Sequence, residues 1–172
     1  MISSEVRDGG PDMEKTTKDL SQSLRDLGLH TFRLKTGTPA RILTSSIDFS
    51  KTQYEPGTDA FLRFSETTRQ EDVRAFKDQV PCYLTYTTPE THEWILNNLN
   101  KSSMYSGVVK GVGPRYCPSI EDKLVRFKDK PRHLLFLEPE SLSMDTTYIQ
   151  GFSTSLPRDI QEHMVHSLPG FK

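Results

Sequence analysis

The amino-acid sequence predicts an α+β fold, in which a mixed β-sheet is accompanied by about four short helices. Residues 80–86 (VPCYLTY) alternate and are rich in β-branched and aromatic side chains, and residues 133–137 (HLLFL) form a continuous apolar run, so both are predicted strands. A clear helix start, Thr88-Pro89, follows the first of them directly. Because several of the strands follow one another without crossover helices, an α+β arrangement is expected.

The first third of the chain is predicted to contain one helix and little other regular structure. Asp12 can cap this helix, Gly28 is its natural end, and leucines at helical spacing form a stripe between them, namely Leu20, Leu24 and Leu27. Residues 29–42 are expected to form short extended pieces. Residues 44–79 are polar and turn-rich, and we predict an excursion with one strand at residues 60–64.

The remaining elements are predicted by clearer signals. Thr88 is the expected N-cap of a helix that starts at Pro89 and buries Trp94, Ile95 and Leu99. Residues 147–150 are expected to pair with residues 133–137. A last helix begins near Pro157, buries a face made of Ile160, Met164 and Leu168, and is ended by Pro169-Gly170.

The composition excludes several classes of protein. The 172 residues suffice for one domain or two small ones, and two cysteines far apart form neither a disulfide framework nor, without a CxxC motif, a zinc site. No run approaches the roughly 18 apolar residues of a membrane span. The N-terminus lacks the order of a secretory signal, so we expect a cytoplasmic protein. A net charge of -1 argues against nucleic-acid binding by bulk charge, although a local basic patch is compatible with it.

The stretch from residue 111 to residue 127 (GVGPRYCPSIEDKLVRF) has the character of a site. Gly111 and Gly113 allow close approach to the main chain, and Ser119 is a suitable N-cap for a short helix. Cys117 would then lie just before a helix N-terminus, where a thiolate is favoured. An inert, buried thiol is the equally weighted alternative, since most free cysteines are of that kind. Cys82 alternates within a strand and is expected in the core.

Several charged and glycine-rich positions admit two interpretations. Arg115 and Arg126 can pair with the phosphates of a dinucleotide or of RNA, whereas Asp122 and Lys123 suit a solvated helix face. The GVG sequence lacks the full GxGxxG fingerprint, so no Rossmann phosphate turn is assigned to it. Lys35 lies in KTGTP (35–39), which predicts a glycine-based turn, either a phosphate- or ribose-binding turn or a plain hairpin turn.

Six motifs stand in the order and approximate spacing of one known family: KTGTPAR (35–41), SIDFS (46–50), PCYLTYT (81–87), GVGPRYCPSIEDKLVRF (111–127), FLEPE (136–140) and GFSTSLP (151–157). They resemble the MnmG (GidA) family over nearly everything from residue 20 to residue 170. The resemblance implies a flavoenzyme that modifies the wobble uridine of tRNA and works with the GTPase MnmE as a homodimer. It also implies FAD, NADH and a folate carbon donor, with a (carboxymethyl)aminomethyl group placed on the base.

The resemblance also implies roles for particular residues. Cys117 matches the family's cysteine implicated in catalysis, where it could add to the uracil ring or assist a proton transfer. Ser21 matches a position that contacts FAD, and Lys35 and Arg41 are candidates for tRNA contact. No metal ligand is implied. The nicotinamide-nucleotide segment corresponds to fifteen consecutive residues that include that cysteine: Gly113, Pro114, Arg115, Tyr116, Cys117, Pro118, Ser119, Ile120, Glu121, Asp122, Lys123, Leu124, Val125, Arg126 and Phe127.

The chain also departs from the family pattern. It shows no N-terminal GxGxxG flavin fold, no C-terminal helical domain and no second functional cysteine, so it resembles a central fragment of an α/β FAD-binding (Rossmann-type) flavoprotein with its inserted domain. On this basis residues 1–43 belong to the FAD-binding domain, 44–110 to the inserted domain and 111–172 to a return into the FAD- and NAD-binding domain. A non-catalytic domain that binds tRNA or a partner is the main alternative, and a thiol hydrolase using Cys117 is a weaker one.

Overall fold

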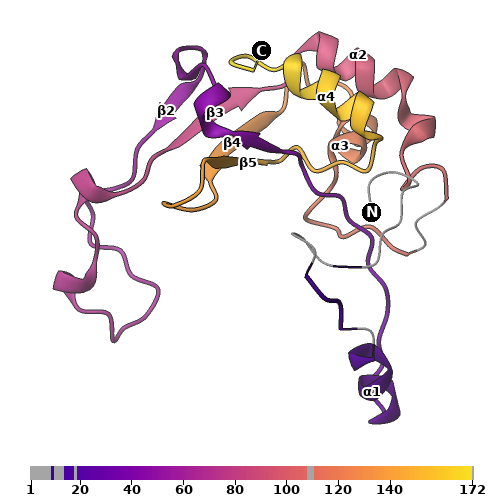
Figure 1. The fold of residues 1–172 in the computed structure, drawn as a ribbon, viewed down its shortest axis with the longest axis horizontal. Coiled ribbons are helices and arrows are strands. Elements are labelled where there is room, and N and C mark those ends of the chain that lie inside the picture. The colour runs from indigo at the N-terminus through magenta and orange to yellow at the C-terminus, as the bar shows by residue number, and fades with distance from the viewer. Residues whose placement is uncertain (1–8, 10–13, 18, 108–110, 172) are drawn as a thin grey trace.

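A five-stranded sheet forms the centre of the molecule (Figure 1). The computed structural model describes residue 9 and residues 14–17, 19–107 and 111–171. The strands follow the order β1-β5-β4-β3-β2, and all four pairings are antiparallel. Their bounds are β1 (Arg41–Leu43), β2 (Gln53–Glu55), β3 (Cys82–Tyr86), β4 (Leu134–Pro139) and β5 (Thr146–Gln150). The predicted α+β arrangement is confirmed, and so is the pairing of residues 147–150 with the apolar strand before them.

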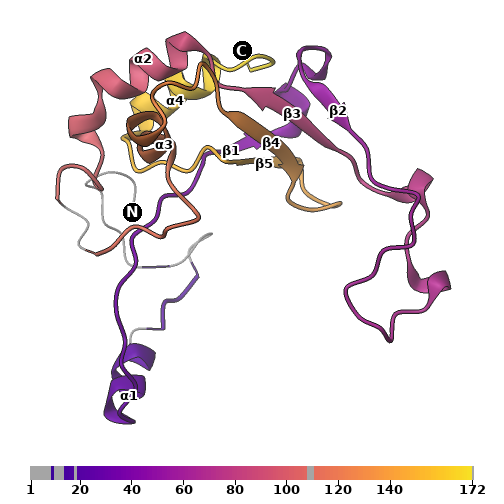
Figure 2. The same cartoon turned by 180° about the vertical axis from the view of Figure 1, so that it is seen from behind.

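Three helices gather beside the sheet, and a fourth lies apart from them. The first three are α2 (Pro89–Asn97), α3 (Ile120–Arg126) and α4 (Arg158–His166). Figures 1 and 2 show α1 (Leu20–Asp26) at the end of an arm that points away from the sheet. Five single-turn 3₁₀ helices connect the strands and α2, namely η2 (Thr44–Ser46), η3 (Phe49–Lys51), η4 (Gln70–Asp72), η5 (Phe76–Asp78) and η6 (Leu99–Lys101).

The hydrophobic core lies between the three gathered helices and one face of the sheet. Its fully buried side chains come from α2, α3, β4, β5, the segment after β5, and α4: Ile95, Ile120, Leu135, Leu137, Ile149, Phe152, Leu156 and Met164. The continuous apolar run of β4 suits a buried strand, but only one face of β4 is buried. Leu134 and Phe136 remain 38% and 37% exposed, because successive side chains of a strand point to opposite faces and the helices cover only one.

The predicted helix starts in the second half of the chain are confirmed. Both helices end earlier than predicted, since Leu99 lies in η6 and α4 ends at His166. Thr88 caps α2 in a reciprocal capping box, in which its hydroxyl accepts from the Thr91 amide and the Thr91 hydroxyl accepts from the Thr88 amide. Pro89 is the first helical residue. Pro157 precedes α4, whose Ile160 and Met164 are buried as expected. These helices therefore begin where local capping chemistry places them.

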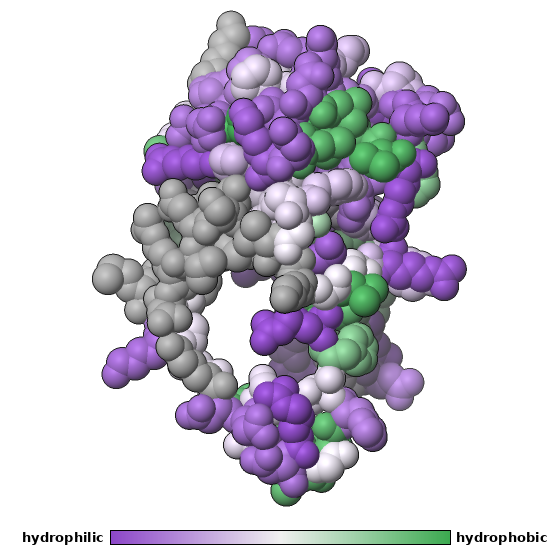
Figure 3. All heavy atoms as spheres, turned by 90° about the vertical axis from the view of Figure 1, so that its right-hand side faces the viewer, coloured by the Kyte–Doolittle hydropathy of each residue, from purple (hydrophilic) through white to green (hydrophobic). Residues whose placement is uncertain are grey.

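The first helix differs from its prediction. Asp12, its expected cap, lies outside the described residues, and residues 14–17 are not helical, so α1 begins only at Leu20. Gly28 follows it with φ of 82°, as expected of a helix end. No residue of α1 is buried, and Leu20 is 57% exposed. Figure 3 shows hydrophobic side chains on the surface at the bottom of the view, where the arm ends.

The polar stretch before β3 contains a strand, but not at the predicted place. Residues 60–64 are irregular, and Phe64 is fully exposed. The structure instead forms β2 at residues 53–55, which pairs with β3, and the chain between them projects away from the sheet (Figures 1 and 2). Residues 60–64 have the composition of a strand but no neighbour to pair with, and a lone strand leaves its backbone hydrogen bonds unmade.

The sheet draws its strands from all three predicted segments of the chain. β1 comes from residues 1–43, β2 and β3 from residues 44–110, and β4 and β5 from residues 111–172.

Within the described residues, no helix combines the length and hydrophobicity that crossing a membrane requires. The same residues form no cluster of three or more His, Cys, Asp or Glu side chains that could hold a metal ion.

Candidate functional site

The surface around Cys117 is an exposed loop that ends in a fixed helix. Arg115, Tyr116 and Cys117 are all exposed, and the Arg115 guanidinium lies 5.1 Å from the centre of the Tyr116 ring. Ser119, which is buried, caps α3 by accepting a hydrogen bond from the Asp122 amide at 3.2 Å, as the sequence predicts. The thiol is therefore accessible, unlike the buried alternative that the sequence also allowed.

Glu121 anchors the first turn of α3 in the protein interior. Its side chain is fully buried, and Oε1 accepts three hydrogen bonds, from the Ser102 hydroxyl at 3.2 Å, the Thr154 hydroxyl at 3.0 Å and the Ser155 amide at 3.0 Å. Oε2 is buried without a hydrogen-bond partner among the described residues. One carboxylate thus holds together α3, the chain after η6 and the segment before α4.

The next two residues of α3 are also tied to the protein. The Tyr105 hydroxyl donates to Asp122 Oδ1 at 2.9 Å, and burial together with this hydrogen bond raises the pKa of Tyr105 to about 12. Lys123 Nζ donates to the Gly151 carbonyl at 2.8 Å. Burial lowers the pKa of Lys123, while the charge of the nearby Cys117 acts in the opposite direction. Asp122 and Lys123 therefore hold the helix in place and are not the solvated face that the sequence suggested.

The predicted nucleotide-binding segment accordingly divides into two groups. Its inward-facing members fix α3: Ser119, Ile120, Glu121 and Leu124 are buried, and Asp122 and Lys123 are half-buried and bonded. Gly113, Pro114 and Pro118 are half-buried in the loop. Its exposed members are Arg115, Tyr116, Cys117, Val125, Arg126 and Phe127. Only the exposed group presents whole side chains to a ligand.

The KTGTP segment is not a turn, so both turn interpretations of it are wrong. It runs extended between two other segments, with a parallel bridge from Leu34 to Val112 and an antiparallel bridge from Thr38 to Thr154. Gly37 is required by this close approach, because a Cβ there would lie 2.6 Å from the Thr154 carbonyl carbon. A glycine is therefore required at position 37, but the reason is a closely packed neighbouring backbone and not a turn.

The two candidates for tRNA contact make bonds within the protein. Lys35 Nζ donates to the Met104 carbonyl at 3.1 Å. Arg41 pairs with Glu140 at 2.7 Å, donates to the Thr38 hydroxyl at 2.7 Å, and lies over the Tyr148 ring. Both cations therefore already have partners in the folded chain.

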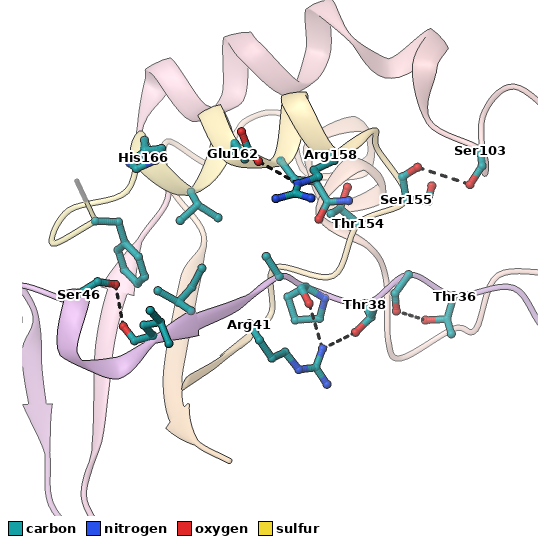
Figure 4. Close-up of a pocket in the computed structure, with 18 residues that line it drawn as sticks. Thr36, Thr38, Arg41, Ser46, Ser103, Thr154, Ser155, Arg158, Glu162 and His166 are labelled. Carbon is teal, nitrogen blue, oxygen red and sulfur yellow. Dashed lines mark hydrogen bonds and ion pairs between the residues drawn. The ribbon is translucent and has the colours of Figure 1, made fainter. Parts of the chain in front are cut away.

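A pocket that the sequence did not predict lies between α4 and the segment that leads into β1 (Figure 4). Its volume is about 740 Å³, which is in the range of small-molecule sites. Arg158, Glu162 and His166 project from α4 on one side, and Thr36 and Thr38 lie on the other. The wall between them includes Thr154 and Ser155, the residues that donate to Glu121. The pocket and the helix that begins beside Cys117 thus share one hydrogen-bond network. No local motif signals such a pocket, since its walls come from distant parts of the chain.

Ser21, the predicted FAD contact, is not brought to this network. It lies exposed on α1, and Figures 1 and 2 show α1 well separated from α3. The structure thus unites Cys117, α3 and the KTGTP segment around Glu121, and it leaves the α1 arm apart.

Comparison with known proteins identifies the family. The family model described as glucose inhibited division protein A matches residues 1–172. The tRNA uridine 5-carboxymethylaminomethyl modification enzyme MnmG of Streptococcus sanguinis (strain SK36) is 55% identical over 163 residues, which make up 95% of this chain and 25% of that enzyme. The enzyme of the same name from Bacillus subtilis (strain 168) is 53% identical over the same shares of the two chains.

Solved structures agree with this comparison. Aquifex aeolicus GidA in the form I crystal superposes with a TM-score of 0.81 at 46% identity, covering 98% of this chain and 29% of that chain. The form II crystal gives a TM-score of 0.77 at 42% identity, with 98% and 27% covered. The chain spans about a quarter of the length of the curated relatives it matches. Since the family model and the relatives agree over nearly the whole chain, it belongs to the glucose inhibited division protein A (GidA) family.

Proposed function

We propose that this chain is a segment of a flavin-dependent enzyme that helps to install a (carboxymethyl)aminomethyl group on the wobble uridine of tRNA. The observation that carries the proposal is the 53–55% identity, over 95% of the chain, to enzymes named for tRNA uridine 5-carboxymethylaminomethyl modification. Because the chain spans a quarter of those enzymes, the complete activity would belong to a longer protein in the cytoplasm. That protein would act as a homodimer with the GTPase MnmE.

Cys117 is the proposed catalytic residue. Its exposed thiol lies at the end of residues 114–117 (PRYC), and α3, which begins soon after it, is fixed by its cap and by the anchored Glu121. An accessible nucleophile on a fixed support can add to an electron-poor ring carbon or pass a proton without reorganising its surroundings. Such a role suits a uracil base held against the loop.

The residues that would hold a nicotinamide nucleotide are the exposed members of residues 113–127. Arg115 and Arg126 offer guanidinium groups to phosphates, and Tyr116 offers an aromatic face. The buried members, such as Glu121, would support these contacts by fixing α3. NADH would supply the reducing equivalents and FAD would carry them, while a folate would supply the carbon.

The contribution of this chain to a flavin site is small. Ser21 is its proposed FAD contact. It lies on α1, which has no buried residue and so forms no enclosed site for the flavin ring. We therefore expect the isolated chain to bind FAD weakly. Titration of the purified chain with FAD, followed by gel filtration and a visible spectrum, checks this expectation. A stoichiometric flavin band would contradict it.

A chimaeric enzyme tests the proposed function directly. Residues 9–171 of this chain would replace the matching segment of Bacillus subtilis MnmG, to which the chain is 53% identical. In cells that lack their own enzyme, the chimaera should restore the modified wobble uridine, as measured by mass spectrometry of tRNA nucleosides. The same chimaera with Cys117→Ser should bind flavin but restore nothing. A folded, flavin-loaded chimaera with intact Cys117 that leaves the tRNA unmodified would refute the proposal.

A further inference from the structure

The connection between α3 and β4 carries an unbalanced positive charge. Residues 126–132 (RFKDKPR), called the basic turn below, contain four basic side chains and one acidic one. All seven residues are exposed. Arg126, Lys128 and Lys130 form no ion pair with the acidic residues that the structure describes, and Arg132 lies over the Tyr86 ring at 3.9 Å. Figure 2 shows this connection running from α3 to β4.

Several other cations of the chain have acidic or carbonyl partners. Arg41 pairs with Glu140, Arg69 with Glu71 and Asp72, and Arg158 with Glu162, while Lys35 and Lys123 donate to backbone carbonyls. The basic turn is therefore a place where positive charge faces solvent without being neutralised. Unpaired, exposed cations crowded on a short loop repel one another, and a bound polyanion relieves that repulsion.

Two histidines lie next to the basic turn. His133 follows the turn directly, and its ring centre lies 5.5 Å from that of His92. We call these two residues the histidine pair. Burial lowers the pKa of both, and the positive charges of His92, Lys123 and Lys130, in that order, lower the pKa of His133 further. One residue of the basic turn, Lys130, therefore acts on the histidine pair.

The position of the turn relative to Cys117 suits one ligand that reaches both. Cys117 precedes the first turn of α3, and the basic turn begins at its last residue. Seven residues at about 1.5 Å per residue place the two ends of α3 about 10 Å apart. This is a span that a few nucleotides of a folded strand can cover. An RNA whose base lies at Cys117 therefore has its neighbouring phosphates near the basic turn.

We propose that the basic turn binds the phosphate backbone of the RNA whose base is presented to Cys117, with Lys128 and Lys130 as the main contacts. The inference rests on the proposed function and assigns its RNA contacts to residues other than Lys35 and Arg41. Ammonium groups bind phosphate as point charges without reading a base. The Arg132 guanidinium, which lies over the Tyr86 ring, would make a further contact with a phosphate.

The test compares two double variants of the whole chain that remove the same charge. Lys128→Ala/Lys130→Ala removes two cations of the basic turn, whereas Lys15→Ala/Lys77→Ala removes two exposed lysines elsewhere. Fluorescence anisotropy measures the binding of labelled tRNA that lacks the wobble modification, at about 50 mM and 200 mM salt. Circular dichroism and urea unfolding show whether each variant keeps its fold, which is expected because all four side chains are exposed.

The turn variant should bind about tenfold more weakly at low salt, and its binding should depend less on salt. Two lost phosphate contacts reduce the slope of log K against log salt by about 1.6, so its further loss between the two salt concentrations is about ninefold smaller than that of the wild-type chain. The control variant should match the wild type. Equal binding by the two double variants would overturn the proposal. So would a wild-type chain that binds no tRNA at low salt, and the chimaeric modification assay would then show separately whether the proposed function still stands.

Discussion

Replacing Glu121 by alanine removes the acceptor that holds three segments together. The Ser102 hydroxyl, the Thr154 hydroxyl and the Ser155 amide would lose their bonds to Oε1. At about 1 to 1.5 kcal/mol for each buried hydrogen bond, the loss is about 3 to 4.5 kcal/mol. Removing Oε2, which is buried without a partner, returns about 1 kcal/mol of desolvation cost. We therefore expect Glu121→Ala to lower the free energy of unfolding by about 3 kcal/mol, a large part of the about 5 to 15 kcal/mol typical of a domain.

Urea unfolding measures this loss, with the fluorescence of Trp94 as the probe because it is the single tryptophan and packs on α4 through His163. With a urea slope of about 2 kcal/mol per molar, the midpoint should fall by about 1.5 M. Glu162→Ala is the matched control, since its carboxylate is 61% exposed and pairs only with Arg158. That variant should lose no more than about 0.5 kcal/mol.

Glu121→Gln separates hydrogen-bond acceptance from charge. Its amide oxygen can still accept from the three donors, while its NH₂ group takes the place of Oε2, which is buried without a hydrogen-bond partner among the described residues. Its stability should lie between those of the wild type and the alanine variant. A loss below about 1 kcal/mol for Glu121→Ala, equal to that of the control, would show that the buried carboxylate does not anchor α3 and would refute the reasoning.

Three further predictions follow from the structure. Iodoacetamide at neutral pH should label Cys117 before Cys82, because burial raises the pKa of the Cys82 thiol, and equal rates by mass spectrometry would contradict this. The free energy of unfolding should fall as the pH drops from about 7 to about 5.5. The pKa values of the histidine pair are lowered in the folded chain, so the unfolded chain binds more protons in this pH range. A urea midpoint that stays constant from about pH 7 to about pH 5.5 would be inconsistent with this prediction. Gly37→Ala should cost about 1 to 3 kcal/mol by pushing a Cβ against a neighbouring backbone, whereas Gly113→Ala, whose Cβ would meet nothing within 4 Å, should be nearly neutral; equal urea midpoints for the two variants would rule out the close approach.

The local sequence determined the elements whose signals act over a few residues. Thr88 and Pro89 start α2, Ser119 starts α3, and Gly28 follows the end of α1, because caps and glycine ends are satisfied by neighbouring backbone groups. The helix start that follows Cys117 also indicated, from local sequence alone, that its thiol can lie exposed in a loop. The six motifs also indicated the family, because the order of short sequence blocks can be compared without knowing the fold.

Tertiary structure alone decided which charged groups of the site have partners inside the protein. No local signal in the sequence shows that Glu121 is buried, yet it lies in the interior, where Ser102 and Ser155 approach it from 19 and 34 residues away. Arg41 is occupied by Glu140, 99 residues distant, and residues 60–64 remain irregular because no strand lies beside them. Hydrogen bonds and ion pairs form through space, so sequence determines which groups are available and only the folded chain determines which of them meet.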